Sequence, residues 1–341
     1  MKAVRFHEHG DTSVLRYEDV PDPRPGRGEV VLAVRACALN GLDLYARAGG
    51  LEQAIALPHI SGADIAGEVV EVGEGVARVE PGDRVLVNPR FFCGRCRNCL
   101  RGEQTGCVDY RVMGWHRPGG YAEHVAVPES NVELIPEGLS FPEAAAVPMA
   151  FTTAWRMLFS RAGLGPDETI LVLGASGGVA SAAVQLARAA GARVLATTRP
   201  EKMDRVRELG ADAVIDYTTE PVASRVLDLT DGRGVDVLVQ TQGGDTWREG
   251  LECMARFGRI AVCAAVQGAS PPEDLGTIWW KQLTIVGSTG GTPLEFAHVV
   301  SQLRAGRIRP VVDVVYPLAQ AAEAQAAFGR HAHVGKVVLA P

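Results

Sequence analysis

The fold class is indicated most clearly by residues 169–180, which read Thr169-Ile170-Leu171-Val172-Leu173-Gly174-Ala175-Ser176-Gly177-Gly178-Val179-Ala180. An apolar run leads through a glycine-rich turn into an Ala-rich segment, residues 179–190, which predicts a strand, a tight turn and a helix. Backbone N–H groups at such a helix start can bind a pyrophosphate, and Gly177 has no Cβ to obstruct its approach. Ala175 and Ala180 are small enough for the turn and for close helix–strand packing. The predicted dinucleotide contacts are Ala175, Ser176, Gly177, Gly178 and Val179.

Strand-like and helical runs alternate after this turn. Arg193–Thr198 is expected to form the next strand, followed by a charged helix over residues 200–209. Further strand-like runs occupy residues 213–216, 235–239, 259–263 and 283–287, and a last helix is expected over residues 293–305. Alternation at this spacing is typical of a doubly wound parallel sheet, so the predicted class is α/β.

The first ~130 residues have a different pattern, with short Val-rich runs separated by Gly and Pro. Residues 28–35 and 67–73 are examples, and Pro81-Gly82-Asp83 precedes another such run. This part is predicted to form a small, irregular β-barrel.

The end of the second strand of the α/β part indicates which dinucleotide is bound. NAD sites place a carboxylate there to accept hydrogen bonds from the ribose hydroxyls. The strand ends instead in Thr197-Thr198-Arg199, with Lys202 close behind. Two cations and two hydroxyls suit a 2′-phosphate, so Thr198, Arg199 and Lys202 favour NADP(H). The alternative is that both cations are merely solvated charges at a helix start.

Four of the seven cysteines crowd into one loop. Cys93, Cys96, Cys99 and Cys107 are separated by two, two and seven residues. Four thiolates can close a tetrahedral shell around Zn²⁺ and leave no open position for water, which is a structural site. An iron–sulfur cluster or two disulfides are the weaker alternatives.

Together these features resemble the medium-chain dehydrogenase/reductase superfamily. The cysteine loop, the Ala175–Ala180 turn and the ending Gly335-Lys336-Val337-Val338-Leu339 carry the resemblance, which extends over essentially the whole chain. It implies a GroES-like catalytic domain over residues 1–130, completed by residues 294–341. It also implies a Rossmann NADP(H)-binding domain over residues 131–293.

Zinc-catalysed members of this superfamily hold a second metal with a cysteine, a His-Glu pair and a later cysteine or acid. At these positions the resemblance places Asn40, Ala63 with Asp64, and Met149. Amide, methyl and thioether groups cannot assemble a three-ligand zinc site, and one carboxylate is insufficient. Cys37 lies three residues too early to substitute. A catalytic zinc is therefore not expected.

The segment Asn40-Gly41-Leu42-Asp43-Leu44-Tyr45 is similar instead to the quinone oxidoreductase branch, which works without catalytic metal, although typical members lack the cysteine loop. The resemblance implies hydride transfer from NADPH to a quinone or an α,β-unsaturated carbonyl. The candidate catalytic residues are Asn40, Asp43, Tyr45 and Asp64. Further cofactor contacts are expected from Thr153, which is also a candidate polar donor, and from Tyr217 and Lys336. Two alternatives stay open: a zinc-type alcohol dehydrogenase and a non-catalytic NADPH-binding protein.

Composition bounds the partners and the compartment. The net charge is −6, from 34 basic and 40 acidic residues, which gives no reason to expect nucleic-acid or membrane binding. No secretory signal is evident, so a cytoplasmic location is expected. The run 283–287 is similar to the edge strand through which this superfamily dimerises, so we expect a homodimer or homotetramer.

Overall fold

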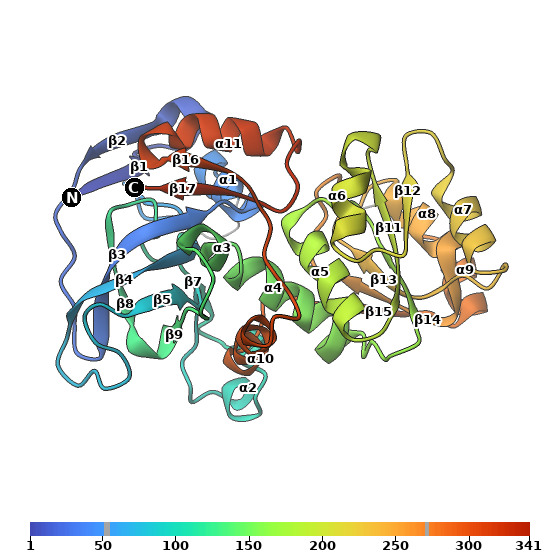
Figure 1. The fold of residues 1–341 in the computed structure, drawn as a ribbon, viewed down its shortest axis with the longest axis horizontal. Coiled ribbons are helices and arrows are strands. Elements are labelled where there is room, and N and C mark those ends of the chain that lie inside the picture. Colours follow the sequence, from blue (N-terminus) through green and yellow to red (C-terminus); the bar gives the residue numbers. More distant parts are fainter. Residues whose placement is uncertain (51–54, 270–272) are drawn as a thin grey trace. The chain divides into compact units, whose positions relative to one another are not determined.

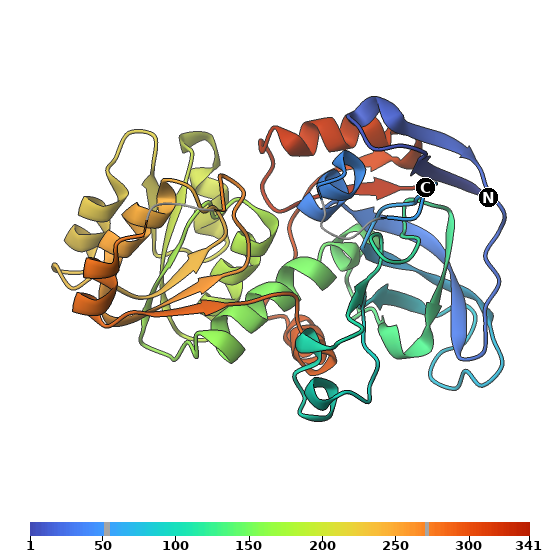
Figure 2. The ribbon, with the colours of Figure 1, turned by 180° about the vertical axis from the view of Figure 1, so that it is seen from behind.

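The computed structural model describes residues 1–50, 55–269 and 273–341. The chain divides into two compact units. Unit 1 comprises residues 1–149, 292–304 and 310–341, and unit 2 comprises residues 150–291 and 305–309. Figures 1 and 2 show both units from opposite sides. In the described part of the chain, no helix combines the length and the apolar character that crossing a bilayer requires.

Unit 1 is built on a twisted, mainly antiparallel sheet. The sheet has the strand order β16-β17-β3-β4-β5-β9, and β8 also pairs with β3. The strands of the unit are β1 (Lys2–Phe6), β2 (Leu15–Asp19), β3 (Glu29–Ala38), β4 (Asp64–Val72), β5 (Arg84–Val87), β6 (Arg90–Phe91), β7 (Arg111–Val112), β8 (His124–Pro128), β9 (Val132–Leu134), β16 (Val312–Pro317) and β17 (Lys336–Ala340). Its α-helices are α1 (Gly41–Ala48), α2 (Arg97–Leu100), α3 (Phe141–Ala145), α10 (Pro293–Arg304) and α11 (Ala321–Gly329), and α4 (Pro148–Trp155) begins here and continues into unit 2.

The C-terminal strands complete this sheet. β17 pairs antiparallel with β3, bringing Val338 opposite Ala38 and Leu339 opposite Cys37. Figure 1 shows the red β17 beside the blue β3. Side chains of both strands belong to the mainly aliphatic core of unit 1, in which Leu32 and Leu339 are fully buried. Burying each such side chain contributes about 1.5–3 kcal/mol, so this core fixes the register that carries polar residues to the strand ends.

Unit 2 is a six-stranded parallel sheet with the order β12-β11-β10-β13-β14-β15. In chain order this is 3-2-1-4-5-6, the doubly wound arrangement of dinucleotide-binding folds. Figure 2 shows helices to either side of the sheet. The strands are β10 (Thr169–Val172), β11 (Arg193–Thr198), β12 (Ala213–Asp216), β13 (Val235–Gln240), β14 (Met254–Val262) and β15 (Thr284–Gly287). The α-helices are α5 (Gly178–Ala189), α6 (Met203–Glu208), α7 (Val222–Leu229), α8 (Thr246–Cys253) and α9 (Leu275–Lys281).

The predicted first boundary at residue 130 differs from the division in the structure. β9 pairs with β5, and α3 packs on β3 and β4, so residues 131–149 belong to unit 1. The helix that follows Ser140 falls within the predicted range 131–293 of the α/β part. It covers the barrel sheet instead. The predicted return of the chain near residue 294 lies close to Thr292, where unit 1 resumes.

Candidate functional site

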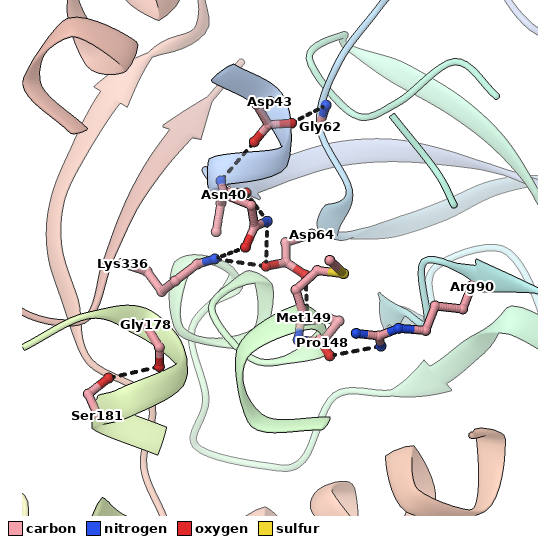
Figure 3. A network of polar contacts seen from close by, with 11 residues as sticks. Asn40, Asp43, Gly62, Asp64, Arg90, Pro148, Met149, Gly178, Ser181 and Lys336 are labelled. Carbon is pink, nitrogen blue, oxygen red and sulfur yellow. Dashed lines mark hydrogen bonds and ion pairs between the residues drawn. The ribbon is translucent and has the colours of Figure 1, made fainter. Parts of the chain in front are cut away.

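Lys336, Asp64 and Asn40 form a buried polar network in unit 1 (Figure 3). The Lys336 Nζ donates to Asn40 Oδ1 at 2.6 Å and to Asp64 Oδ2 at 3.0 Å. Side chains of the ion pair are 5% exposed for Lys336 and fully buried for Asp64. Three different segments meet here, since Asn40 follows β3, Asp64 begins β4 and Lys336 begins β17.

The orientation of the Asn40 amide is set by its neighbours. Its Nδ2 donates to Asp64 Oδ2 at 3.0 Å and to the Ala38 carbonyl at 3.3 Å. The Oδ1 is therefore left to accept from the Lys336 ammonium. A buried charge is tolerated only when it is paired and hydrogen-bonded, and this network meets both conditions.

Asp43 fixes the backbone on which this network is built. Its Oδ2 accepts from the Asn40 N–H at 2.7 Å and its Oδ1 from the Gly62 N–H at 3.0 Å. One carboxylate thus ties the start of α1 to the loop that leads into β4. Burial raises the pKa of the Asp43 carboxyl to about 6, although these two N–H groups and Lys336 lower it.

Gly62 is required at this junction by its backbone and by its surroundings. Its φ is +104°, a conformation that L side chains rarely adopt. An added Cβ would lie 2.6 Å from Tyr121 Cδ1 and 2.7 Å from Cys37 Sγ. Cys37 itself is buried in β3, and burial raises the pKa of its thiol well above the ordinary value, which suits an apolar packing role.

The residues around Asp64 do not fit a catalytic zinc. Asp64 Oδ1 accepts from the Met149 N–H at 2.7 Å, and Asp64 Oδ2 accepts from both Lys336 and Asn40. A cation at this carboxylate would have to displace the ammonium. Within residues 1–50, 55–269 and 273–341, the one group of three or more His, Cys, Asp or Glu side chains placed to hold a metal is the cysteine cluster.

That cluster brings together Cys93, Cys96, Cys99 and Cys107, whose sulfur atoms all lie within 4.8 Å of one another. The backbone N–H of Cys93 donates to Cys107 Sγ, and the backbone N–H of Cys96 donates to Cys93 Sγ, each at 3.3 Å. Backbone N–H donors lower the pKa of the Cys96 thiol to about 6, whereas burial raises that of Cys99 to about 12. Four converging sulfurs with N–H support fit a closed, structural Zn²⁺ site.

The glycine turn in unit 2 has the geometry of a phosphate-binding helix start. Gly177 is the N-cap of α5 and supplies no side-chain hydrogen bond to the first turn. Gly174 and Ala175 are held to β11, because their N–H groups donate to Thr197 Oγ1 at 3.0 Å and to the Thr197 carbonyl at 2.8 Å. The N-terminal N–H groups of an uncapped helix favour an anion, so the turn fits a dinucleotide pyrophosphate.

Cations and hydroxyls gather beside this turn, at the end of β11. Lys202 Nζ donates to Ser176 Oγ at 3.3 Å, and Arg199 Nε donates to Tyr217 Oη at 3.0 Å. Lys202 is 5% exposed, so its charge is largely withdrawn from water. The hydrogen bond to Tyr217 raises the pKa of Arg199. The structure thus brings these four residues together in two hydrogen-bonded pairs, and their cations and hydroxyls are groups that can bind a 2′-phosphate.

Two further predicted residues lie outside these clusters. Tyr45 lies on α1, outside the described hydrogen-bond network of Asn40 and Asp64, with 50% of its surface exposed. Thr153 is buried in the part of α4 that belongs to unit 2. Their proposed roles stay predictions. Sequence reasoning missed the backbone N–H groups of Gly62 and Met149, which no side-chain pattern signals. The cofactor contact expected of Lys336 also stays a prediction; in the structure its amine donates to Asp64 and Asn40.

Known proteins match this chain along its whole length. Residues 26–137 match the alcohol dehydrogenase GroES-like domain, and residues 178–305 match the zinc-binding dehydrogenase family. The zinc-type alcohol dehydrogenase-like protein of Schizosaccharomyces pombe is 34% identical, with 99% of each chain covered. The quinone oxidoreductase of Pseudomonas aeruginosa is 33% identical, covering 100% of this chain and 99% of its own.

Solved structures agree with these matches. A crystal structure of an NAD-dependent alcohol dehydrogenase is 40% identical over all of both chains, with a TM-score of 0.97. The cobalt- and zinc-bound alcohol dehydrogenase of Pyrobaculum aerophilum is 35% identical with a TM-score of 0.91, covering 100% of this chain and 99% of that one. The chain is an oxidoreductase of the medium-chain dehydrogenase/reductase superfamily, with a GroES-like domain and a Rossmann-type parallel sheet.

Proposed function

We propose that this protein uses NADPH to reduce a quinone or an α,β-unsaturated carbonyl, without a catalytic zinc and with one structural zinc. The observation that carries the proposal is the Lys336 ammonium on Asp64 Oδ2 and Asn40 Oδ1. These are two of the positions at which zinc-catalysed relatives hold their metal. An ammonium and a metal ion at bonding distance from the same carboxylate oxygen would repel each other strongly in this buried site.

The choice of NADPH is supported by the residues beside the glycine turn. Bound NADPH supplies a hydride, and the chain's own residues bind and orient it. Lys202 and Arg199 would hold the 2′-phosphate, with Ser176, Thr198 and Tyr217 as further hydrogen-bonding groups. Ala175 to Val179 would hold the pyrophosphate at the start of α5.

The choice of a conjugated acceptor follows from the missing Lewis acid. A metal contributes several kcal/mol of charge stabilisation when an unactivated carbonyl accepts a hydride. Quinones and enones delocalise the developing charge, so they depend less on stabilisation by a metal. The side chain of Asn40 would orient the network, and Asp43 would hold the backbone of Asn40 and Gly62 in place.

An alcohol dehydrogenase is the second candidate, because several relatives carry that name, including NAD-dependent ones. Metal analysis and a substrate panel separate the two. One zinc per chain, NADPH preference and turnover of quinones or enones support the first proposal. Two zincs per chain, or clear preference for NADH with alcohols, refute it. Cofactor binding without any turnover indicates a non-catalytic NADPH-binding protein.

We further propose that the chain forms a homodimer or homotetramer through unit 2. β15 is the edge strand of the parallel sheet, and Ile285 on it is 40% exposed. Phe257, Trp279 and Trp280 are each at least 60% exposed in the same unit. An exposed strand edge accompanied by large apolar side chains favours pairing with a second copy.

A further inference from the structure

The Lys336 ammonium has one hydrogen-bond donor more than its protein partners use. A lysine ammonium carries three N–H donors. In the described ranges the acceptors of Lys336 Nζ are Asn40 Oδ1 and Asp64 Oδ2. The side chain is 95% withdrawn from solvent, with 5% exposed. A buried donor without an acceptor is costly, so this site favours a ligand oxygen.

The negative charge of Asp64 is shared among several donors. Besides Lys336, its oxygens accept from Asn40 Nδ2 at 3.0 Å and from the Met149 N–H at 2.7 Å. Each of these N–H dipoles offsets part of the carboxylate charge. The ammonium therefore keeps positive potential for a further acceptor, even though it is paired.

The ammonium is also held in one place. Asn40 Oδ1 and Asp64 Oδ2 fix it from two segments, and the Asn40 amide cannot turn without losing its bonds to Asp64 and Ala38. A donor that is already oriented needs no reorganisation when charge develops on an acceptor, which makes it effective in stabilising an oxyanion.

We propose that Lys336 is a catalytic residue whose third N–H binds the carbonyl oxygen of the substrate, in place of a metal ion. The inference rests on the proposed function. For an enone, the hydride leaves NADPH with its electron pair and forms a C–H bond at the β-carbon, while the C=C π pair moves toward the carbonyl and leaves an enolate oxygen. Lys336 stabilises that oxygen without giving up its proton. Water then protonates the α-carbon, so NADPH is oxidised to NADP⁺ and the enone is reduced to the saturated carbonyl.

The enolate can be imitated by a phenolate, which allows a test without nucleotide or turnover. The probe is 4-nitrophenol, whose ionised form is distinguished by its visible absorbance. The full chain is titrated with the probe across a pH series, giving the pH at which half of the bound probe is ionised. Lys336→Met should raise this pH by about one to three units, the effect of losing a neighbouring opposite charge.

Three other variants keep the result interpretable. Lys336→Arg retains a cation and should retain most of the phenolate preference. Asp64→Asn keeps the ammonium and should lower the half-ionisation pH further. The double variant Lys336→Met with Asp64→Asn removes both charges, so no unpaired carboxylate is left to unfold the protein, and it should resemble Lys336→Met.

The matched control is Lys2→Met, which removes an exposed lysine from its aspartate partner Asp19, 2.8 Å away in the same unit. It should leave the titration unchanged. The proposal is overturned if the wild type shows no preference for phenolate over phenol. It is also overturned if Asp64→Asn loses that preference as Lys336→Met does. The ion pair would then only maintain the fold of the site, and the ammonium would not bind the phenolate directly.

Turnover separates this inference from the function on which it rests. Lys336→Met should reduce kcat with an enone by roughly 10²–10³-fold, the range for removal of one oxyanion donor. A wild type that favours phenolate but reduces no enone or quinone would refute the proposed function and leave the ligand site of Lys336 standing. A wild type that reduces enones without phenolate preference would refute Lys336 alone.

Discussion

Asp43→Asn tests how a buried carboxylate supports the network. Burial raises the pKa of the Asp43 carboxyl from 3.8 to about 6. The folded state therefore holds this proton more tightly than the unfolded state, and the resulting stabilisation is lost as pH rises from about 3.8 through 6. The whole difference corresponds to about 3 kcal/mol, at about 1.4 kcal/mol for each pH unit.

The amide is neutral like the protonated acid and does not titrate, so at this position pH changes the stability of the wild type alone. Its oxygen can accept one of the N–H groups of Asn40 and Gly62, but its NH₂ cannot accept the other, as the hydroxyl oxygen of the acid can. The variant should therefore be less stable than the wild type in acid. Between pH 4.5 and 7.5 the free energy of unfolding of Asp43→Asn should rise by about 2 kcal/mol relative to wild type. Activity should fall nevertheless, because the amide NH₂ opposes an N–H that Asp43 accepts at 2.7 or 3.0 Å.

Urea unfolding followed by circular dichroism at each pH measures the difference. Glu129→Gln is the control, because Glu129 Oε2 also accepts two backbone N–H groups, those of Ala77 and Arg78, each at 3.0 Å. Glu129 is only partly buried, and these bonds lower its pKa, so the stability difference between Glu129→Gln and wild type should change with pH in the opposite sense. A stability difference for Asp43→Asn that is flat, or that falls as pH rises, would show that burial does not control this carboxyl.

Other predictions concern the cofactor, the metal and the assembly. Lys202→Met should lower kcat/KM for NADPH by roughly 10–100-fold, since a charge-assisted hydrogen bond contributes about 1.5–3 kcal/mol. It should change kcat/KM for NADH little, and equal losses with both nucleotides would contradict the 2′-phosphate assignment. Cys96→Ser should reduce the zinc content below one per chain and lower the Tm, whereas Cys263→Ser, outside the cluster, should leave zinc content unchanged; plasma emission spectroscopy and calorimetry decide. Ile285→Lys at the edge strand should shift the assembly to smaller species in analytical ultracentrifugation, and an unchanged mass would exclude β15 from the interface.

The parts that the sequence predicted well are local. The Ala175–Ala180 turn and the cysteine loop place their functional atoms within a few residues, so spacing alone defines their geometry. β11 begins and ends where the strand-like run predicted, at Arg193 and Thr198. The four sulfur atoms lie within 4.8 Å of one another because one short loop carries all four cysteines.

The hydrogen-bond network around Lys336 could not be predicted from the spacing of residues in the sequence. Lys336 and Asp64 are 272 residues apart, and their contact depends on the pairing of β17 with β3 and of β3 with β4. Asp43 is a candidate catalytic residue in the sequence, but a pattern of side chains does not reveal that its carboxylate accepts two backbone N–H groups. The domain boundary was missed for a related reason, since β9 has three residues and gives a weak periodic signal.

The position of β17 near the C-terminus affects how unit 1 folds during synthesis. The end of β3 at Cys37 and Ala38 emerges from the ribosome early and pairs with β17, which is made only after all of unit 2, whereas β8 pairs with Glu29 to Ala33 much sooner. During that interval this end of the strand edge is open to wrong partners, and chaperones that shield strand edges should speed recovery of the native state. Refolding after dilution from urea should show unit 2 regaining helicity before Lys336 becomes protected from amine-reactive labels.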